Sequence, residues 1–261
     1  MDNKITKNST VLLIDLKDSS RQYLVQVSKN KFATKDGSIN LAELLDKEFG
    51  SVISTHLGAK FAVLQPTVYD RIMKGIKRTT QIVYPKDAGY ILLSLDVRSG
   101  MRIFECGSGS GAMTALLANA VAPNGKIISY EKEKRFYEIS KQNLEELDVL
   151  DYVELYNRDI ADGVEGAPFD AIFIDIRQPW EFVEILWESL SPGAPIVFIL
   201  PTTNQVIRLL QAIEHNSGFA DIEVAETLLR FYKPVPERFR PKDRMVAHTV
   251  FIISAKKICK L

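Results

Sequence analysis

The sequence predicts an α/β protein: a seven-stranded, mostly parallel sheet with helices on both faces, ending in an antiparallel hairpin and preceded by a small β domain. Three observations lead to this prediction. Short apolar runs alternate with helical segments between residues 101 and 200, which is typical of a parallel sheet. Two longer β runs follow and favour a hairpin over another crossover. The first part of the chain is richer in turn-forming residues.

The N-terminal part of the chain is expected to be a small domain over residues 1–66. Its short apolar runs, 11–14 and 23–27, are separated by polar, turn-prone residues, a pattern that predicts short strands. From Thr67 to Ile76 apolar residues recur at helical spacing. We therefore place the boundary between residues 65 and 70 and assign residues 67–261 to a second domain.

The second domain contains the runs that we expect to form its sheet. The parallel strands are expected at residues 101–105, 126–130, 153–156, 171–175 and 195–200. Helical spacing predicts helices over 112–120 and 205–216. The closing runs, 222–229 and 245–255, are joined by a proline-rich stretch, which predicts that they pair as a hairpin.

Composition limits the kinds of substrate, metal site and cellular compartment that the protein is expected to have. With 261 residues, 46% of them hydrophobic, the chain can bury a sizeable core. Basic and acidic residues both number 33, so a nucleic-acid substrate would require a local basic patch. The two cysteines are far apart, which favours a reducing compartment and predicts no metal site. No apolar run has signal-peptide or bilayer length, so we expect a cytoplasmic protein without a membrane partner.

Residues 105–111, ECGSGSG, have the pattern of a cofactor loop. A strand that turns through alternate glycines into a helix brings backbone amides towards a ligand, and side chains at the glycines would block that approach. The cofactor contacts expected here are Glu105, Gly107, Ser108, Gly109, Ser110 and Gly111. A dehydrogenase stays open at this point, because dinucleotide-binding folds use a similar loop.

Three further acids follow expected strand ends: Glu131, Asp159 and Asp175. Because parallel strands end at one edge of a sheet, these carboxylates are expected to lie together there. Glu131 suits the ribose hydroxyls of a cofactor, and Asp159 suits an adenine amino group. Asp175 can orient a nitrogen nucleophile, or accept its proton, during attack on a sulfonium methyl group. A nicotinamide enzyme does not require Asp175, so the set favours S-adenosylmethionine, with S-adenosylhomocysteine as product. Taken singly, Glu131 or Asp159 is equally well a solvated loop residue, whereas for Asp175 the catalytic role is favoured over a turn cap.

Four segments together resemble the tRNA (adenine-N1)-methyltransferases of the TrmI type, in an archaeal-like form. They are residues 78–88, 105–111, 175–180 and 244–249. The first and last are the most specific, because cofactor binding does not require them. The resemblance implies a class I methyltransferase fold and methyl transfer to N1 of adenine 58 in the T-loop of tRNA, with adenine 57 left open as a second target. It also implies a homotetramer.

The resemblance further implies roles for individual residues. Asp175 would contact the target adenine as base or orienting acid and also lie against the cofactor. Gln81 would contact the cofactor, and Tyr84 would line the site as a second catalytic residue. Tyr84 precedes Pro85 and is equally well a core or hinge aromatic. His248 lies in a strand-like run, where a core histidine is favoured over a catalytic one.

An adenine-N1 methyltransferase needs a basic approach surface, because the Watson–Crick edge of the target base is reachable only after the base is extruded. Two basic clusters provide the expected RNA contacts: Lys77, Arg78 and Lys86 in the first, and Arg238, Arg240 and Arg244 in the second. Aromatic residues interleave with the second cluster and favour it, since charge runs alone are usually solvated faces.

Other functions remain open from the sequence. The chain could methylate another RNA, a protein or a small molecule, although an isoaspartyl-type enzyme does not account for the N-terminal β domain and a catechol-type enzyme usually needs a metal site. It could also be a non-catalytic RNA-binding paralogue, as in the two-subunit eukaryotic enzyme. The intact cofactor loop, Glu131 and Asp175 argue against that last alternative.

Overall fold

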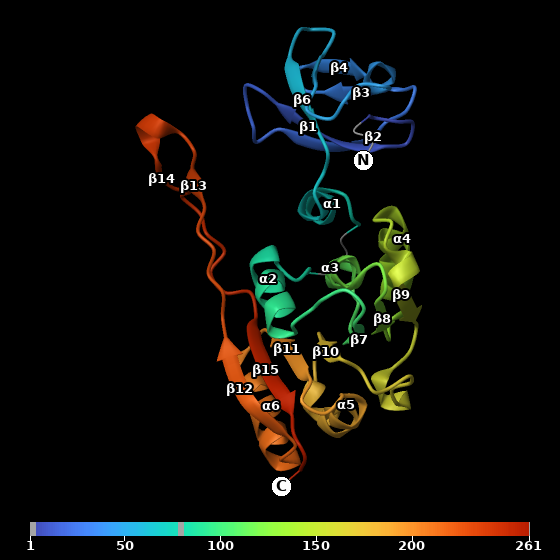
Figure 1. The fold of residues 1–261 in the computed structure, drawn as a ribbon. Helices are drawn as coiled ribbons and strands as arrows, with labels where there is room; N and C mark the ends of the chain where they lie inside the picture. The colour runs from blue at the N-terminus through green and yellow to red at the C-terminus, as the bar shows by residue number, and fades with distance from the viewer. Residues whose placement is uncertain (1–3, 78–80, 261) are drawn as a thin grey trace. The chain divides into compact units, whose positions relative to one another are not determined.

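The computed structural model describes residues 4–77 and 81–260, which form two compact units (Figure 1). One unit ends at Ile76 and the other begins at Lys77. The boundary falls later than the expected one at residue 66, because helix α1 (Val68–Lys74) packs against strand β2 (Gln22–Gln26) of the first unit. A capping box fixes the start of α1: Thr67 Oγ1 accepts from the Asp70 N–H at 3.2 Å, and the Asp70 carboxylate accepts from the Thr67 N–H at 3.1 Å.

The first unit is built from short antiparallel strands, as expected. Its main sheet has the order β2-β1-β6-β5. The remaining strands of this unit are β1 (Thr10–Asp15), β3 (Lys31–Thr34), β4 (Gly37–Asn40), β5 (Val52–Ser54) and β6 (Lys60–Leu64), with a 3-10 turn η1 (Leu41–Leu44) after the β3–β4 hairpin. Alternate residues of β1 and β6 point inward, so that Val11, Leu13, Phe61 and Val63 are completely buried in a core of their own.

The second unit contains the expected seven-stranded sheet, in the order β12-β15-β11-β10-β7-β8-β9. Its strands are β7 (Arg102–Cys106), β8 (Lys126–Tyr130), β9 (Val153–Tyr156), β10 (Ala171–Ile174), β11 (Pro195–Leu200), β12 (Phe219–Ala225) and β15 (Phe251–Lys257). The strands from β11 to β9 run parallel to one another, and β15 runs antiparallel to both β11 and β12.

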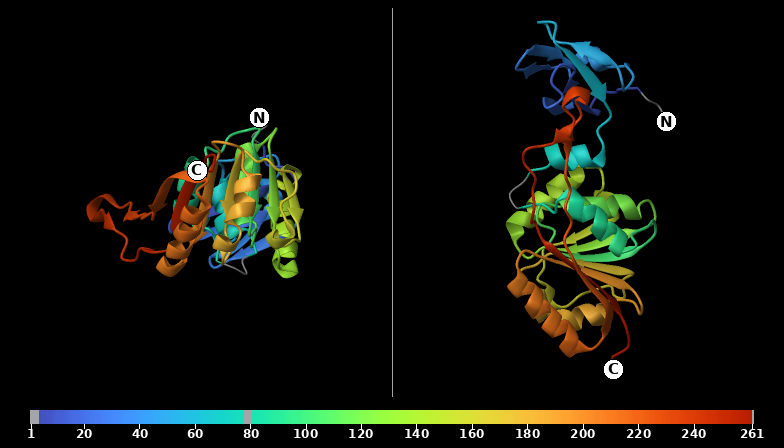
Figure 2. Two further views of the ribbon diagram at one scale, coloured as in Figure 1. Left: turned by 90° about the horizontal axis from the view of Figure 1, so that it is seen from below. Right: turned by 90° about the vertical axis from the view of Figure 1, so that its left-hand side faces the viewer.

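Helices cover both faces of this sheet (Figure 2). On one face lie α2 (Pro85–Ser94), α3 (Ala112–Val121) and α4 (Lys134–Glu146), and on the other α5 (Val183–Ser189) and α6 (Thr203–Asn216). Short 3-10 turns connect them: η2 (Leu150–Tyr152), η3 (Ile160–Asp162), η4 (Pro179–Glu181) and, further on, η5 (Pro236–Arg238). Because both faces are covered, β10 is buried along its whole length, which explains its uninterrupted apolar sequence.

The closing strands β12 and β15 pair antiparallel as expected, but their connection is much longer than a hairpin turn. Between β12 and β15, residues 226–250 leave the sheet as a long excursion, which we call the arm (Figure 1). Two-residue strands β13 (Tyr232–Lys233) and β14 (Arg240–Pro241) pair within it. The expected runs 222–229 and 245–255 each extend into the arm, where the structure has no strand at residues 226–229 or 245–250 and where Met245 and Val246 are exposed.

Within residues 4–77 and 81–260, the structure contains no helix with the length and apolar character needed to cross a membrane.

Candidate active site

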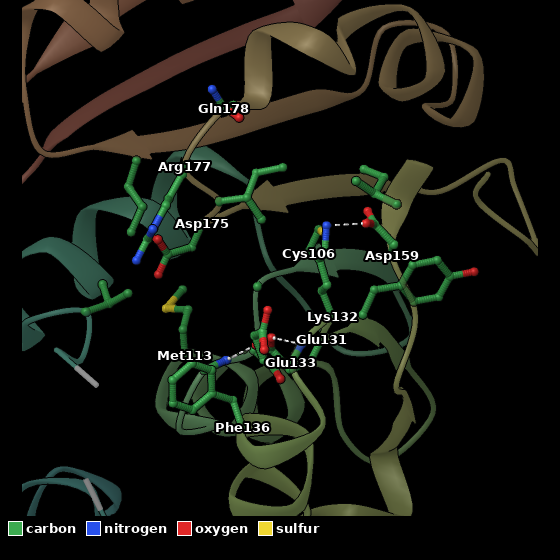
Figure 3. A pocket seen from close by; sticks show the side chains of 18 of the residues that line it. Cys106, Met113, Glu131, Lys132, Glu133, Phe136, Asp159, Asp175, Arg177 and Gln178 are labelled. Atoms are coloured by element: carbon green, nitrogen blue, oxygen red, sulfur yellow. Dashed lines mark hydrogen bonds and ion pairs between the residues drawn. The ribbon is translucent and has the colours of Figure 1, made fainter. Parts of the chain in front are cut away.

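A cavity of about 880 Å³ opens beside the carboxyl ends of the central parallel strands of the second unit (Figure 3). The predicted residues that line it are Gln81, Gly107, Ser108, Gly109, Ser110, Glu131, Asp159 and Asp175. Glu105, Gly111 and Tyr84 are not part of this lining. The strand-end acids expected to meet at one edge of the sheet thus do so.

Close backbone packing positions the glycine loop against Asp175. The Asp175 N–H donates to the Cys106 carbonyl at 2.8 Å. Gly107 has a φ of 96°, and a Cβ added there would lie 2.1 Å from the Asp175 carbonyl oxygen. Only glycine fits, because any other residue would clash with the strand end that carries Asp175. Gly111, with a φ of 77°, is the N-cap of α3 and shapes the turn without lining the cavity.

The Glu131 carboxylate is buried at the end of β8 and is held by two backbone amides. Its Oε2 accepts from the Gly109 N–H at 2.9 Å, and its Oε1 accepts from the Glu133 N–H at 2.9 Å. Each oxygen has a further lone pair, which leaves capacity for the ribose hydroxyls expected there. The same contacts tie the glycine loop to β8.

Glu105 supports the loop from below. Its Oε2 accepts from the hydroxyls of Thr114 and Ser129, each at 2.6 Å, whereas its Oε1 has no partner among the described residues. Burial raises the pKa of Glu105 to about 7, assisted by the charges of Asp175 and Glu131 and opposed by the two hydroxyls. Sequence reasoning placed Glu105 at the cofactor, but in the structure it lies behind the lining.

Asp159 lies at a second edge of the cavity, where Lys132 covers it. Asp159 Oδ1 accepts from the Ala161 N–H at 3.1 Å, and Oδ2 pairs with Lys132 Nζ at 2.6 Å. The hydrogen bond from Lys132 is the main reason that the pKa of Asp159 is lowered. Because the Lys132 side chain is 68% exposed, solvent screens this ion pair and it contributes little to stability.

Asp175 has a carboxyl group of altered acidity. Desolvation raises its pKa to about 7, and the negative charge of Glu131 adds to the effect. Asp175 is nevertheless exposed as a residue, and it lines the cavity, so that solvent reaches it there. A cationic ligand in the cavity would favour its ionised form.

Several lining residues were not found from the sequence. Met113, Phe136 and Phe182 supply apolar walls, and Arg177 and Gln205 supply polar groups. Arg177 lies inside a segment that carried the resemblance, so its position after Asp175 was the available signal. Gln205 had no local signal, because α6 reaches the cavity through the topology of the sheet.

Tyr84 is half-buried as the N-cap residue of α2. Its hydroxyl accepts from Gln81 Nε2 at 3.2 Å, and Gln81 lines the cavity. Tyr84 therefore contacts the site through Gln81 in this structure.

Lys86, one of the expected RNA contacts, lies in a buried polar cluster. Its ammonium donates to Asp87 Oδ1 at 2.9 Å, to the Thr227 carbonyl at 2.9 Å and to Thr249 Oγ1 at 2.5 Å. The hydroxyls of Thr227 and Thr249 in turn donate to Asp87 at 2.6 and 2.7 Å. With its side chain 7% exposed, Lys86 has no free donor for a phosphate and instead joins α2 to both ends of the arm.

The other expected RNA contacts have mixed surroundings. Lys77 is exposed, and Arg78 lies outside the described residues. In the arm, Arg240 pairs with Asp243, whereas Arg238 and Arg244 are exposed and have no acidic partner among residues 4–77 and 81–260. The rings of Tyr232 and Phe239 stack at 5.2 Å close to these arginines in the sequence.

The chain matches a known family over most of its length. Residues 62–255 match the model of the tRNA methyltransferase complex GCD14 subunit. The chain belongs to the GCD14 family. It is 31% identical to the tRNA (adenine(57)-N(1)/adenine(58)-N(1))-methyltransferase TrmI of Methanocaldococcus jannaschii, over 94% of each chain. It is also 31% identical to the tRNA (adenine(58)-N(1))-methyltransferase TrmI of Thermus thermophilus, over 93% of this chain and 95% of the relative.

Solved structures resemble this GCD14-family chain along its full length. A SAM-dependent O-methyltransferase from Thermotoga maritima has a TM-score of 0.93 at 42% identity, covering 99% of this chain and 96% of its own. The tRNA (m1A58) methyltransferase TrmI of Aquifex aeolicus has a TM-score of 0.86 at 36% identity, covering 98% and 99%. The resemblance inferred from the sequence is thereby confirmed. Archaeal and Thermus relatives are equally similar, so the archaeal character stays a prediction.

S-adenosylmethionine is the cofactor of this GCD14-family protein, and the cavity fits it. The Ser108 hydroxyl lines the cavity, is buried and has no hydrogen-bond partner among the described residues, as expected of a group that serves a polar ligand. The glycine turn has no side chains that would block the approach of the cofactor, and the Glu131 carboxylate has lone pairs that suit ribose hydroxyls.

Proposed function

We propose that this protein transfers the methyl group of S-adenosylmethionine to N1 of adenine 58 in the T-loop of tRNA, acting in the cytoplasm as a homotetramer. The observation that carries the proposal is Asp175, whose carboxylate faces the cavity directly beside the cofactor loop. The archaeal relative's name includes adenine 57 as well, so adenine 57 is a second candidate target.

The cofactor supplies an electrophilic methyl group on a sulfonium sulfur. Adenine N1 attacks through its lone pair, so no proton has to leave N1 before the methyl group moves. Asp175 accepts a hydrogen bond from the exocyclic amino group and stabilises the positive charge that develops on the base. Glu131 and Asp159 hold the ribose and adenine of the cofactor, while the contact of Gly107 with Asp175 fixes the spacing between the donor and acceptor ends.

Substitution of Asp175 tests its role. Asp175→Ala is expected to retain cofactor binding by calorimetry and to lose most methyl transfer from labelled cofactor to tRNA. Asp175→Asn keeps the shape and one acceptor oxygen but removes the charge, so it separates hydrogen bonding from electrostatic stabilisation. Turnover near that of the wild type in Asp175→Ala would remove Asp175 from the mechanism.

The acceptor atom is tested by mass spectrometry of nucleosides from unmodified tRNA after reaction. N1-methyladenosine is expected, and it should be absent when adenine 58 is replaced by guanine in a tRNA that also has guanine at position 57. Ribose-methylated nucleosides would instead support an oxygen acceptor, as in the name of the Thermotoga structure. A tRNA with adenine at position 57 and guanine at 58 reports on the second target.

The arm provides the proposed RNA surface. Between Arg230 and Arg244 it carries Arg230, Lys233, Arg238, Arg240, Lys242 and Arg244 against Glu237 and Asp243. The stacked Tyr232 and Phe239 rings are 46% and 70% exposed, which suits stacking on unpaired bases. Lys77 adds a basic group outside the arm.

The homotetramer is supported by uncovered apolar side chains in the arm. Leu228, Leu229, Met245 and Val246 are between 44% and 65% exposed, although they flank the point where the arm leaves the sheet. Such a group of side chains is typical of a contact between subunits. Sedimentation of the chain, whose monomer mass is 29.4 kDa, tests this assembly, and Leu228→Asp with Val246→Asp is expected to yield smaller species.

A further inference from the structure

Three cationic side chains line the cavity: Lys132, Arg158 and Arg177. Lys132 pairs with Asp159, and Arg158 pairs with Glu165 at 2.5 Å while lying over the Tyr130 ring. The Arg177 guanidinium has no hydrogen-bond or ion-pair partner among residues 4–77 and 81–260. Of the three, Arg177 is therefore the cation of the lining that has no ion-pair partner in the part of the chain that the structure describes.

The backbone of Arg177 is held in place although its side chain is free. Gln205 Nε2 donates to the Arg177 carbonyl at 3.0 Å, and Thr202 Oγ1 donates to Gln205 Oε1 at 2.8 Å. Arg177 follows Asp175 by two residues on the same loop, and Pro179, two residues further on, is buried. A fixed backbone with a solvated guanidinium is ready to bind an anion without reorganising the loop.

The position of Arg177 separates it from the cofactor groups. Figure 3 shows Arg177 next to Asp175, with Asp159 on a different side of the cavity. Glu131 and Asp159 are the groups that suit the ribose and adenine of the cofactor, so Arg177 lies where the acceptor enters. An adenine extruded from RNA brings its phosphodiester to the rim of such a cavity.

Arginine suits this ligand. A guanidinium keeps its charge at all physiological pH values and forms paired hydrogen bonds with phosphate oxygens. Asp175 next to it suits the amino group of the base instead, so the loop holds one group for the base and one for the backbone.

We propose that Arg177 binds the RNA phosphate next to the target adenine and thereby makes the site specific for adenine within an RNA strand. The inference rests on the proposed function of the site. It assigns substrate recognition to a residue that takes no part in the methyl transfer itself.

Arg177→Ala is expected to raise the KM for tRNA by about tenfold to a hundredfold, the range for loss of a charged hydrogen bond. The Kd for S-adenosylmethionine should stay within about twofold. The slope of log affinity against log salt should fall by about 0.7 to 0.9 in magnitude, as for loss of one phosphate contact. Arg177→Lys should restore the salt slope and only part of the affinity.

Arg208→Ala is the matched control. Arg208 lies on α6 over the Trp180 ring at 5.5 Å and does not line the cavity. The Arg208→Ala variant removes the same charge from a neighbouring element outside the cavity. Its KM for tRNA and its salt slope should therefore stay close to those of the wild type.

A tRNA with a neutral methylphosphonate next to adenine 58 completes the test. With the wild type, this modified tRNA should react more poorly than normal tRNA. With Arg177→Ala, the modified and the normal tRNA should react equally, because the substitution and the methylphosphonate remove the same contact. Additive losses would overturn the proposal, and so would a raised Kd for the cofactor with an unchanged KM for tRNA. If the wild type forms no N1-methyladenosine at all, the proposed function fails instead, and the two failures are thus distinguishable.

Discussion

The carboxyl group of Asp175 enters the physiological pH range because burial and the charge of Glu131 raise its pKa to about 7. The ionised form is the one that stabilises positive charge on the base. The kcat/KM for S-adenosylmethionine reports the pKa of the free enzyme, and it should therefore rise with pH through about 7. A bound sulfonium favours the carboxylate, so the rise should shift to lower pH when cofactor is saturating. Rates measured across this range on the wild type and on Asp175→Asn check it, and a limb retained in the variant would contradict it.

Glu105 is expected to make stability depend on pH. Its pKa is about 7 in the folded chain against 4.5 for the ordinary group, so the folded state binds the proton more tightly than the unfolded state. The stabilisation that results is complete below the unfolded pKa and is lost as pH rises through about 7. Glu105→Gln removes this dependence. Relative to the wild type, the free energy of unfolding of the variant should therefore be higher at about pH 8 than at about pH 5. Urea unfolding at both pH values measures it; equal differences in free energy would count against the assignment.

Among the elements, the turn between β7 and α3 is closely packed against the strand end that carries Asp175. Gly107→Ala places a Cβ against the Asp175 carbonyl at a positive φ, so the loop or β10 has to shift. We expect a loss of more than 1 kcal/mol in stability together with weaker cofactor binding. Calorimetry and thermal unfolding test this, and Gly193→Ala is the control, because Gly193 also has a positive φ but no atom within 4 Å of an added Cβ.

The cluster of Lys86 and Asp87 connects α2 to the arm. Removing one partner, as in Lys86→Met, leaves a buried carboxylate unpaired and should lower the free energy of unfolding by about 3 to 5 kcal/mol. The double variant Lys86→Met with Asp87→Leu should lose less than Asp87→Leu and Lys86→Met added together. Chemical unfolding of all three proteins measures the coupling, and strict additivity would show that the buried pair is not coupled.

Elements whose burial is fixed by local sequence were predictable, and those fixed by distant partners were not. The strands 126–130 and 195–200 match β8 and β11, because both faces of the sheet require apolar residues there. The expected strand 153–156 matches β9, an edge strand in which only Val153 is buried. Lys86 looked like a surface cation, since its threonine partners lie far along the chain. His248 was read as a core residue, yet its ring is 42% exposed and bridges Glu226 and the Pro201 carbonyl at the base of the arm.

At the scale of the whole molecule, the two units have separate hydrophobic cores. Phe61→Ala, in the core of the first unit, should destabilise that unit by about 3 to 5 kcal/mol and leave cofactor affinity unchanged. Phe198→Ala should instead destabilise the unit that carries the cavity. Hydrogen exchange resolved by segment, with and without cofactor, distinguishes the two; faster exchange throughout both units in Phe61→Ala would mean that they unfold together.

The position of β15 has a consequence for how the chain folds during synthesis. β15 lies between β11 and β12 in the sheet, yet it is translated after both of them and after the arm. Until Phe251–Lys257 leave the ribosome, β12 has no partner strand and the edge of β11 is open. A nascent chain paused within the arm would thus expose two unpaired edges at once, the form most prone to wrong association. β15 therefore completes the sheet only after the arm has been translated, and its pairing secures both ends of the arm in the same step.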